Sequence, residues 1–171
     1  MNLRDRLQPA LLDRLTDLAP QSQVEADDTR VMNKSQIREA VLRDLSWLLN
    51  SVQPLGAEGV PYPYAADSVL NYGLPAMSGQ MASRIDVSQL ERTLKQAILR
   101  FEPRVMEDSL EVKALDASSV LDTHNVIEFE IRGFMWAQPV PLELLLRTQV
   151  DLEAGQVQVR DMGGSAPKRR P

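Results

Sequence analysis

The hydrophobic period of this chain changes at Pro103, and this change most constrains the fold. Before it, apolar residues recur every three or four positions over residues 33–50 and 86–101, which predicts two amphipathic helices. After it, apolar and polar residues alternate, which predicts strands with one buried and one solvated face. The alternating apolar sets are Leu110, Val112 and Ala114; Ile127, Phe129 and Ile131; Leu142, Leu144 and Leu146; and Val157 and Val159. We therefore predict an α+β domain, in which two principal helices pack on one face of an antiparallel sheet of about four strands.

Local signals set the ends of the two predicted helices. Asn33 and Ser35 are possible N-caps of the first helix. Asp86 and Gln89 have the spacing of a capping box at the start of the second. Because a proline disfavours helical geometry at the residue before it, we expect the second helix to end at Glu102.

The two predicted helices are joined by a connector, residues 51–82, that is rich in proline and glycine. Irregular connectors of this length are uncommon inside compact domains and tend to be functional or structurally specialised. Within it, residues 68–75 (SVLNYGLP) are apolar enough to lie on the core.

We expect four segments along the chain. Residues 1–18 are predicted to form an amphipathic helix and residues 19–32 a flexible linker. Residues 33–162 form the α+β domain, and residues 163–171 form a disordered tail. A helix on such a linker either docks a partner or packs on the domain, and the sequence leaves both open.

The composition excludes several kinds of chemistry. The chain has no cysteine, which excludes a disulfide scaffold, a thiolate metal site and a cysteine nucleophile. Its single histidine excludes sites that need two imidazoles from one chain. A formal net charge of -5 disfavours nucleic acid as a partner. Because no apolar run approaches the length of a membrane span, we expect a soluble, cytoplasmic protein without membrane insertion. The residues imply no cofactor and no metal.

Few side chains offer catalysis. His124 lies in a polar turn between strands, where a histidine is usually solvated. Glu128 and Glu130 lie on the wet face of a strand beside Arg132, where an acid has no reason to hold a proton at neutral pH. One simple mechanism remains, which is acid catalysis by a pair of carboxylates that includes Glu102, as in a glycan hydrolase.

The tripeptide Glu102-Pro103-Arg104 is a candidate partner-binding site. Proline holds the chain extended at the junction between helix and strand, so that the residues on either side of it point the same way. Opposite charges side by side on a stiff backbone suit a bidentate contact with a partner. The alternative is a helix stop with a solvated ion pair, worth about 0–1 kcal/mol.

The predicted sheet offers a second kind of contact. An open antiparallel sheet has two edges, and an edge strand can accept a strand from another chain. The alternative is that charged residues and prolines near the edges block such pairing, and the sequence does not decide between the two.

Three stretches of the chain, in this order and spacing, resemble a known family. They are residues 38–50 (REAVLRDLSWLLN), residues 68–75 followed by Ser78-Gly79, and residues 98–104 (ILRFEPR). The resemblance is to the TssE subunits of type VI secretion baseplates, which are similar to the small wedge protein of contractile-phage baseplates. It covers about residues 30–160.

The resemblance implies a structural assembly protein and not an enzyme. Glu102, Pro103 and Arg104 match the family's Glu-Pro-Arg motif, which is thought to hold the subunit to the core bundle of the other wedge proteins. The contractile sheath is thought to be contacted by strand exchange, which we expect within residues 127–135 and 142–160. Alanine at position 102 or 104 is expected to leave the fold intact and to weaken wedge binding.

Two other functions stay open from the residues alone. One is a glycan hydrolase with Glu102 as the acid, which requires turnover of peptidoglycan by the isolated chain. The other is a generic cytosolic interaction module that docks through its N-terminal helix, which requires residues 1–20 for partner binding.

Overall fold

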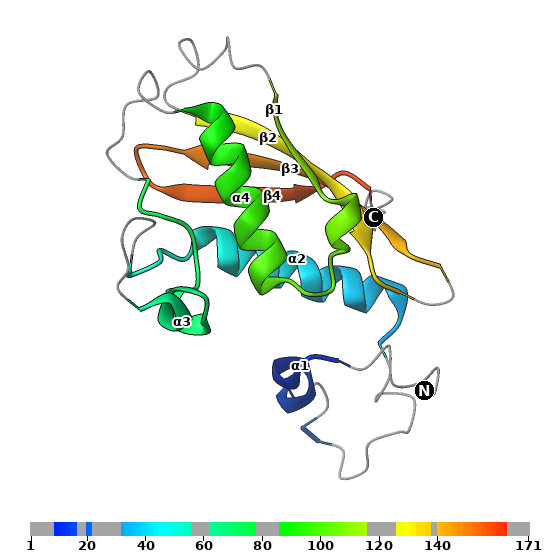
Figure 1. Ribbon diagram of the computed structural model, residues 1–171. Coiled ribbons are helices and arrows are strands. Elements are labelled where there is room, and N and C mark those ends of the chain that lie inside the picture. The colour runs from blue at the N-terminus through cyan, green and yellow to red at the C-terminus, as the bar shows by residue number, and fades with distance from the viewer. Residues whose placement is uncertain are drawn as a thin grey trace.

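Four antiparallel strands form one sheet in the order β1-β2-β3-β4 (Figure 1). The strands are β1 (Glu111–Leu115), β2 (Val126–Met135), β3 (Leu142–Asp151) and β4 (Gln156–Asp161). The helices are α1 (Leu11–Leu15), α2 (Lys34–Asn50), α3 (Pro63–Ala66) and α4 (Val87–Phe101), with short 3₁₀ turns η3 (Val69–Asn71) and η5 (Glu107–Ser109). This computed structural model describes residues 9–16, 20–21, 32–55, 62–77, 86–115, 126–137 and 140–163.

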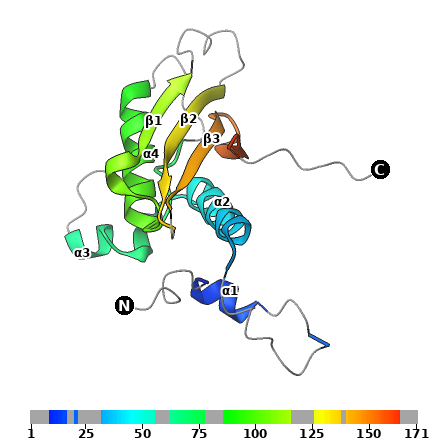
Figure 2. The same ribbon diagram turned by 90° about the vertical axis from the view of Figure 1, so that its right-hand side faces the viewer.

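The predicted α+β arrangement is confirmed. In β2 the side chains of Ile127, Phe129 and Ile131 are buried, whereas Arg132 on the other face is exposed. The helices α2 and α4 supply the apolar side chains that cover this buried face, with α4 against β1 and α2 against β4 (Figures 1 and 2). The apolar faces that alternation predicts in the strands and that the helical period predicts in α2 and α4 therefore pack together in one core.

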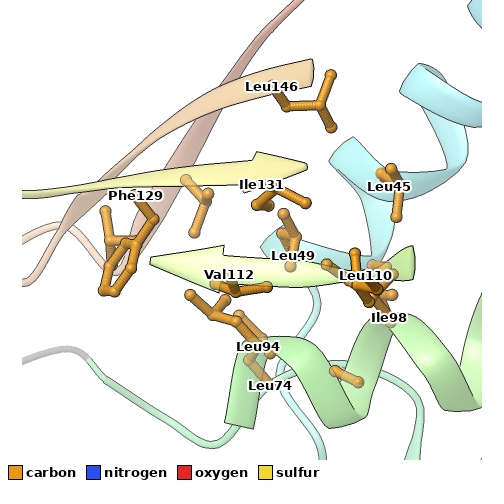
Figure 3. Packing of buried hydrophobic residues seen from close by; sticks show 14 of the residues in the cluster. Leu45, Leu49, Leu74, Leu94, Ile98, Leu110, Val112, Phe129, Ile131 and Leu146 are labelled. Carbon is orange, nitrogen blue, oxygen red and sulfur yellow. The ribbon is translucent and has the colours of Figure 1, made fainter. Parts of the chain in front are cut away.

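The core lies between the sheet and these two helices. Figure 3 shows Leu45 and Leu49 of α2, Leu94 of α4, and Phe129 and Ile131 of the sheet within one cluster of buried side chains. Each of these five side chains is almost fully buried. Burial of one such side chain stabilises a fold by about 1.5–3 kcal/mol, so this cluster accounts for much of what holds the layers together.

The helix ends follow the capping signals in the sequence. Asn33 caps α2 in a full capping box, in which its Oδ1 accepts from Gln36 N and Gln36 Oε1 accepts from Asn33 N. Asp86 caps α4 by accepting from Gln89 N at 3.1 Å. The last residue of α4 is Phe101, and Glu102 is its C-cap, as the proline at position 103 predicts.

Side chains from the two helices hold the outer strands. The amide of Asn50 donates to Val157 O at 2.8 Å and accepts from Val157 N at 2.9 Å, and thus occupies part of the outer edge of β4. On the opposite edge of the sheet, Glu91 Oε1 accepts from Ala114 N at 2.7 Å. Each outer strand therefore has one edge position closed by a helix side chain.

Arg38 makes a second attachment of α2 to the sheet. Its guanidinium donates to both carboxylate oxygens of Asp161 in β4, at 2.6 and 2.7 Å, and to Glu143 O in β3 at 2.8 Å. The hydrogen bond with Asp161 raises the pKa of Arg38. With Asn50 near one end of β4 and Arg38 near the other, α2 is fastened along this strand.

The connector lies on the core only in part. Asn71 and Leu74 are buried, as expected for residues 68–75, but Val69 and Leu70 are 79% and 69% exposed. The expectation was wrong for these two residues because the 3₁₀ turn η3, capped by Ser68, directs Asn71 inward and leaves Val69 and Leu70 outside.

Several of the predicted segments lie wholly or partly outside the described residues. Within the predicted helix 1–18, the structure describes α1. Most of the linker 19–32, the turn with His124 and the tail after Gly163 lie outside the described part. The four-segment division of the chain therefore stays a prediction.

Gly73 has a positive φ of 121° where the connector passes α2's end. Here Leu74 N donates to Ser51 O at 2.8 Å, and a Cβ on Gly73 would overlap the backbone of Ser51. Gly133 of β2, by contrast, leaves 3.5 Å between a Cβ and its nearest neighbours. Glycine is thus required at position 73 and not at position 133.

We expect Gly73→Ala to lower the free energy of unfolding by about 2–4 kcal/mol, because left-handed strain adds to steric overlap. Gly133→Ala is the matched control and should change it by less than about 1 kcal/mol. Urea denaturation followed by circular dichroism measures both variants. Equal losses would contradict the assigned role of Gly73.

Candidate partner-binding site

The Glu102-Pro103-Arg104 corner follows α4 in the chain and lies against the end of β2. Glu102 N donates to Ile98 O at 2.8 Å, which closes the last turn of the helix. Beyond the corner, Trp136 N donates to Arg104 O at 2.7 Å, and Val105 forms an antiparallel bridge with Met135. Backbone hydrogen bonds on both sides therefore hold this corner in place.

Glu102 and Arg104 lie side by side, as the spacing across proline predicts. Arg104 Nε donates to Glu102 Oε1 at 2.7 Å and Nη2 donates to Oε2 at 2.5 Å. The backbone N–H of Arg104 also donates to Oε1, at 3.1 Å. A bidentate contact of this kind is among the stronger charge-assisted hydrogen bonds.

The burial of the pair is unequal, which the sequence does not reveal. Glu102 is 3% exposed, whereas the Arg104 side chain is 28% exposed and Pro103 lies at the surface. The alternative of a solvated ion pair is therefore wrong. Because Glu102 is buried, we now expect truncation of either charged residue to lower the stability of the fold as well as to change the surface.

The corner belongs to a row of five alternating charges, which we call the charge row: Asp13, Arg43, Asp44, Arg104 and Glu102. Arg104 Nη2 donates to Asp44 Oδ2 at 2.5 Å. Arg43 donates to Asp44 Oδ1 at 2.8 and 2.9 Å and to Asp13 Oδ1 at 2.6 Å. The row connects α1, α2 and the corner, three parts that lie far apart in the sequence.

The electrostatics of the row keep the guanidinium groups charged. Burial opposes the charge on Arg104, but the hydrogen bonds and negative charges of Glu102 and Asp44 outweigh it and raise its pKa. The pKa of Arg43 is raised chiefly by its hydrogen bond with Asp13. Burial, followed by the charges of Asp44 and Glu102, raises the pKa of the nearby Tyr72 phenol.

The corner forms part of the wall of a groove of about 460 Å³. Four aromatic side chains also line this groove: Trp47, Tyr72, Phe101 and Trp136. The Tyr72 and Phe101 rings meet edge to face, with centroids 5.2 Å apart. The guanidinium of Arg43 lies 5.1 Å from the centroid of the Trp47 ring, which is half exposed.

Sequence reasoning missed the aromatic part of this site. Trp47 falls off the stripe formed by Ile37, Val41, Leu45 and Leu48, so its exposure follows from the helical period. The sequence pattern does not predict the partial exposure of Trp136, because this residue lies just beyond the alternating run of β2. Exposed tryptophan and partly exposed arginine are typical of surfaces that bind other proteins.

The other acids considered for catalysis are paired on the outer face of the sheet. Glu128 accepts from Gln149 Nε2 at 2.5 Å, and Glu130 lies 2.6 Å from Arg132 Nε. In the part of the chain that the structure describes, no cluster of three or more histidine or acidic residues could hold a metal ion. None of the described helices combines the length and the hydrophobicity that a membrane crossing needs.

The fold and the groove are those of a small α+β protein with a surface suited to another protein chain. A model of the family described as baseplate wedge protein gp25 matches residues 35–140, and the chain belongs to this family. TssE is the type VI homologue of gp25, so the resemblance seen in the sequence is confirmed. No curated protein and no solved structure matches the chain.

The family gives the chain a structural role in a phage-tail-like baseplate, in contact with other baseplate components. The matched range contains the corner, the four aromatic residues of the groove and Asp44. It excludes α1 and the strands β3 and β4. Most of the residues that line the groove therefore lie within the range that the family model matches, whereas α1 lies outside it.

We expect Arg104→Ala to lower the free energy of unfolding by about 3–5 kcal/mol, because it leaves the carboxylate of Glu102 buried without its cation. Arg132→Ala is the matched control, because Arg132 pairs with Glu130 across the same spacing but is 63% exposed. That control should cost about 1 kcal/mol or less. Similar losses in both variants, measured by urea denaturation, would show that the burial of Glu102 does not matter.

Proposed function

We propose that this protein is a structural component of a cytoplasmic type VI secretion baseplate, where it joins other wedge proteins to the contractile sheath and seeds sheath assembly. The family and the three sequence stretches that resemble TssE support the type VI assignment. The observation that carries the proposal is the aromatic groove beside the corner, because it places a family motif on a surface fit for a partner.

On the wedge side, the groove and corner act together. Because Glu102 is occupied by Arg104, the partner meets Pro103, the exposed part of Arg104 and the aromatic walls, and not a free carboxylate. The function of Glu102 is then to orient Arg104. An arginine already held in its binding geometry loses less conformational entropy when a partner docks.

On the sheath side, the sheet offers β1 and β4 as edges. Of the ranges expected from the sequence, residues 127–135 and the β3 part of 142–160 lie inside the sheet, so only β4 within them is an edge. α2 fastens β4 through Asn50 and Arg38, whereas β1 has one edge N–H taken by Glu91. We therefore assign the exchange of a strand with the sheath to β1.

The glycan hydrolase is not favoured by the site. A general acid needs a free, protonated oxygen close to the glycosidic bond. Both oxygens of Glu102 instead accept hydrogen bonds from Arg104, and Asp44 on the other side of that guanidinium is bound by Arg43. The arrangement suits a fixed scaffold better than proton transfer.

We expect Trp47→Ala and Arg104→Lys to weaken binding to the wedge proteins by about tenfold or more, because exposed tryptophan and bidentate arginine supply much of the energy of such contacts. Co-purification and calorimetric titration with the wedge complex measure this. Arg104→Lys keeps the positive charge near Glu102, so the fold is expected to persist.

Arg92→Lys, an exposed position on α4, is the matched control and should bind like the wild type. Circular dichroism of each variant separates a loss of binding from a loss of folding. Normal binding by folded Trp47→Ala and Arg104→Lys variants would overturn the assignment of the groove to the wedge.

A proline substitution in each edge strand tests which edge accepts a strand from the sheath. The position chosen in each strand is one whose backbone N–H points away from the sheet. Ala114 N donates to Glu91, and Val159 lies two residues from Val157, whose N–H donates to Asn50, so both N–H groups point outward. Proline there keeps the sheet ladder but blocks an added strand.

We expect Ala114→Pro to abolish the seeding of sheath by wild-type sheath subunits, and Val159→Pro to leave it unchanged. Sedimentation and electron microscopy of the assembled sheath measure the outcome. The reverse result assigns the exchange to β4, and full seeding by both variants would rule out strand exchange at either edge.

A further inference from the structure

The helix α1 contacts the domain with its polar side. The side chain of Asp13 is 6% exposed, whereas Leu11, Leu12 and Leu15 are 71%, 47% and 74% exposed. An amphipathic helix that packs as part of a core buries its apolar stripe instead. α1 is therefore held to the domain by charge, with its leucines facing outward.

The position of α1 is at the groove. Ala10, the residue that precedes α1, is part of the groove wall. Asp13 bonds to Arg43 of α2, whose guanidinium lies 5.1 Å from the centroid of the Trp47 ring. α1 thus meets the groove beside its half-exposed tryptophan and occupies one donor of the arginine next to it.

The carboxylate that holds α1 to the domain has only one of its two oxygens hydrogen-bonded. Asp13 Oδ1 accepts from Arg43, but Oδ2 is buried and is the one described side-chain N or O atom of that kind without a hydrogen-bond partner. A buried acceptor without a partner opposes docking. None of the leucines of α1 is buried to offset it. The docked arrangement is therefore only weakly stabilised and can be released.

We propose that α1 is a latch, docked by the chain itself at the wall of the groove, that competes with the wedge partner for this site. In the docked form Asp13 accepts a hydrogen bond from Arg43. When the wedge partner enters the groove, the partner displaces α1 and breaks this hydrogen bond. This inference rests on the proposed function, since it concerns the regulation of the same groove. A binding site that is closed for part of the time binds its partner more weakly by the fraction that is closed.

The first test concerns α1 in the free chain. In the docked helix Arg14 N donates to Ala10 O and Thr16 N donates to Leu12 O, so these two amides report on whether the helix is formed and held. Asp13→Asn and Asp13→Lys remove the attraction to Arg43, and the lysine reverses it. We expect hydrogen exchange of these amides, measured by NMR, to be about fivefold faster or more in both variants than in the wild type.

The second test concerns the partner. We expect Asp13→Asn and Asp13→Lys to bind the purified wedge complex about tenfold more tightly than the wild type does, with the greater effect from lysine. Arg14→Ala is the matched control on the same helix. The side chain of Arg14 is exposed, so this variant should match the wild type in both tests.

The outcomes separate the two proposals. Unchanged exchange in the Asp13 variants shows that Asp13 does not hold α1 and overturns the latch. Faster exchange with weaker wedge binding makes α1 part of the interface, which also overturns it. If the wild type and all variants fail to bind the wedge complex, the proposed function fails and the latch loses its role, even where exchange shows that Asp13 docks α1.

Discussion

The structure around the groove depends on the neutralisation of one buried carboxylate. Glu102 is almost inaccessible to water, and an acid in that position requires a cation within hydrogen-bonding distance. Pro103 places Arg104 on the same side of the chain, where the guanidinium reaches both oxygens. The geometry of the corner depends on this contact, since a misplaced Arg104 would leave Glu102 unpaired.

This arrangement decides what kind of recognition the groove can perform. The charges of Glu102, Arg104 and Asp44 already bind one another, and four aromatic side chains line the groove beside them, with the outer side of Arg104 as a polar element. Few polar groups then need to lose water without gaining a partner when another protein docks. Under the proposed function, recognition rests on the shape of the aromatic walls and on an arginine held in a fixed orientation.

The sequence predicts those parts of the structure that depend on local pattern. Alternation in β2 and the helical stripe in α4 predict burial because each residue's face follows from its position in the element. The contact of Glu102 with Arg104 is also local, across two residues. The participation of Asp44 is not, because it lies 60 residues from Arg104 and meets it only once α2 and α4 have packed.

The sequence did not predict that Val69 and Leu70 are exposed or that Glu102 is buried, and the reason is the same in both cases. Hydrophobicity predicts the total amount of burial better than it predicts which residue of an irregular segment is buried. In the connector, one 3₁₀ turn decides this. At the corner, a buried acid is a rare outcome that only the arginine beside it makes acceptable.

The side-chain amide of Asn50 imitates one residue of a fifth strand, because it offers Val157 both a donor and an acceptor. A sheet finished in this way resists stacking side by side with identical sheets. A single amide at a helix end can thus hinder edge-to-edge pairing between the β4 strands of two identical chains.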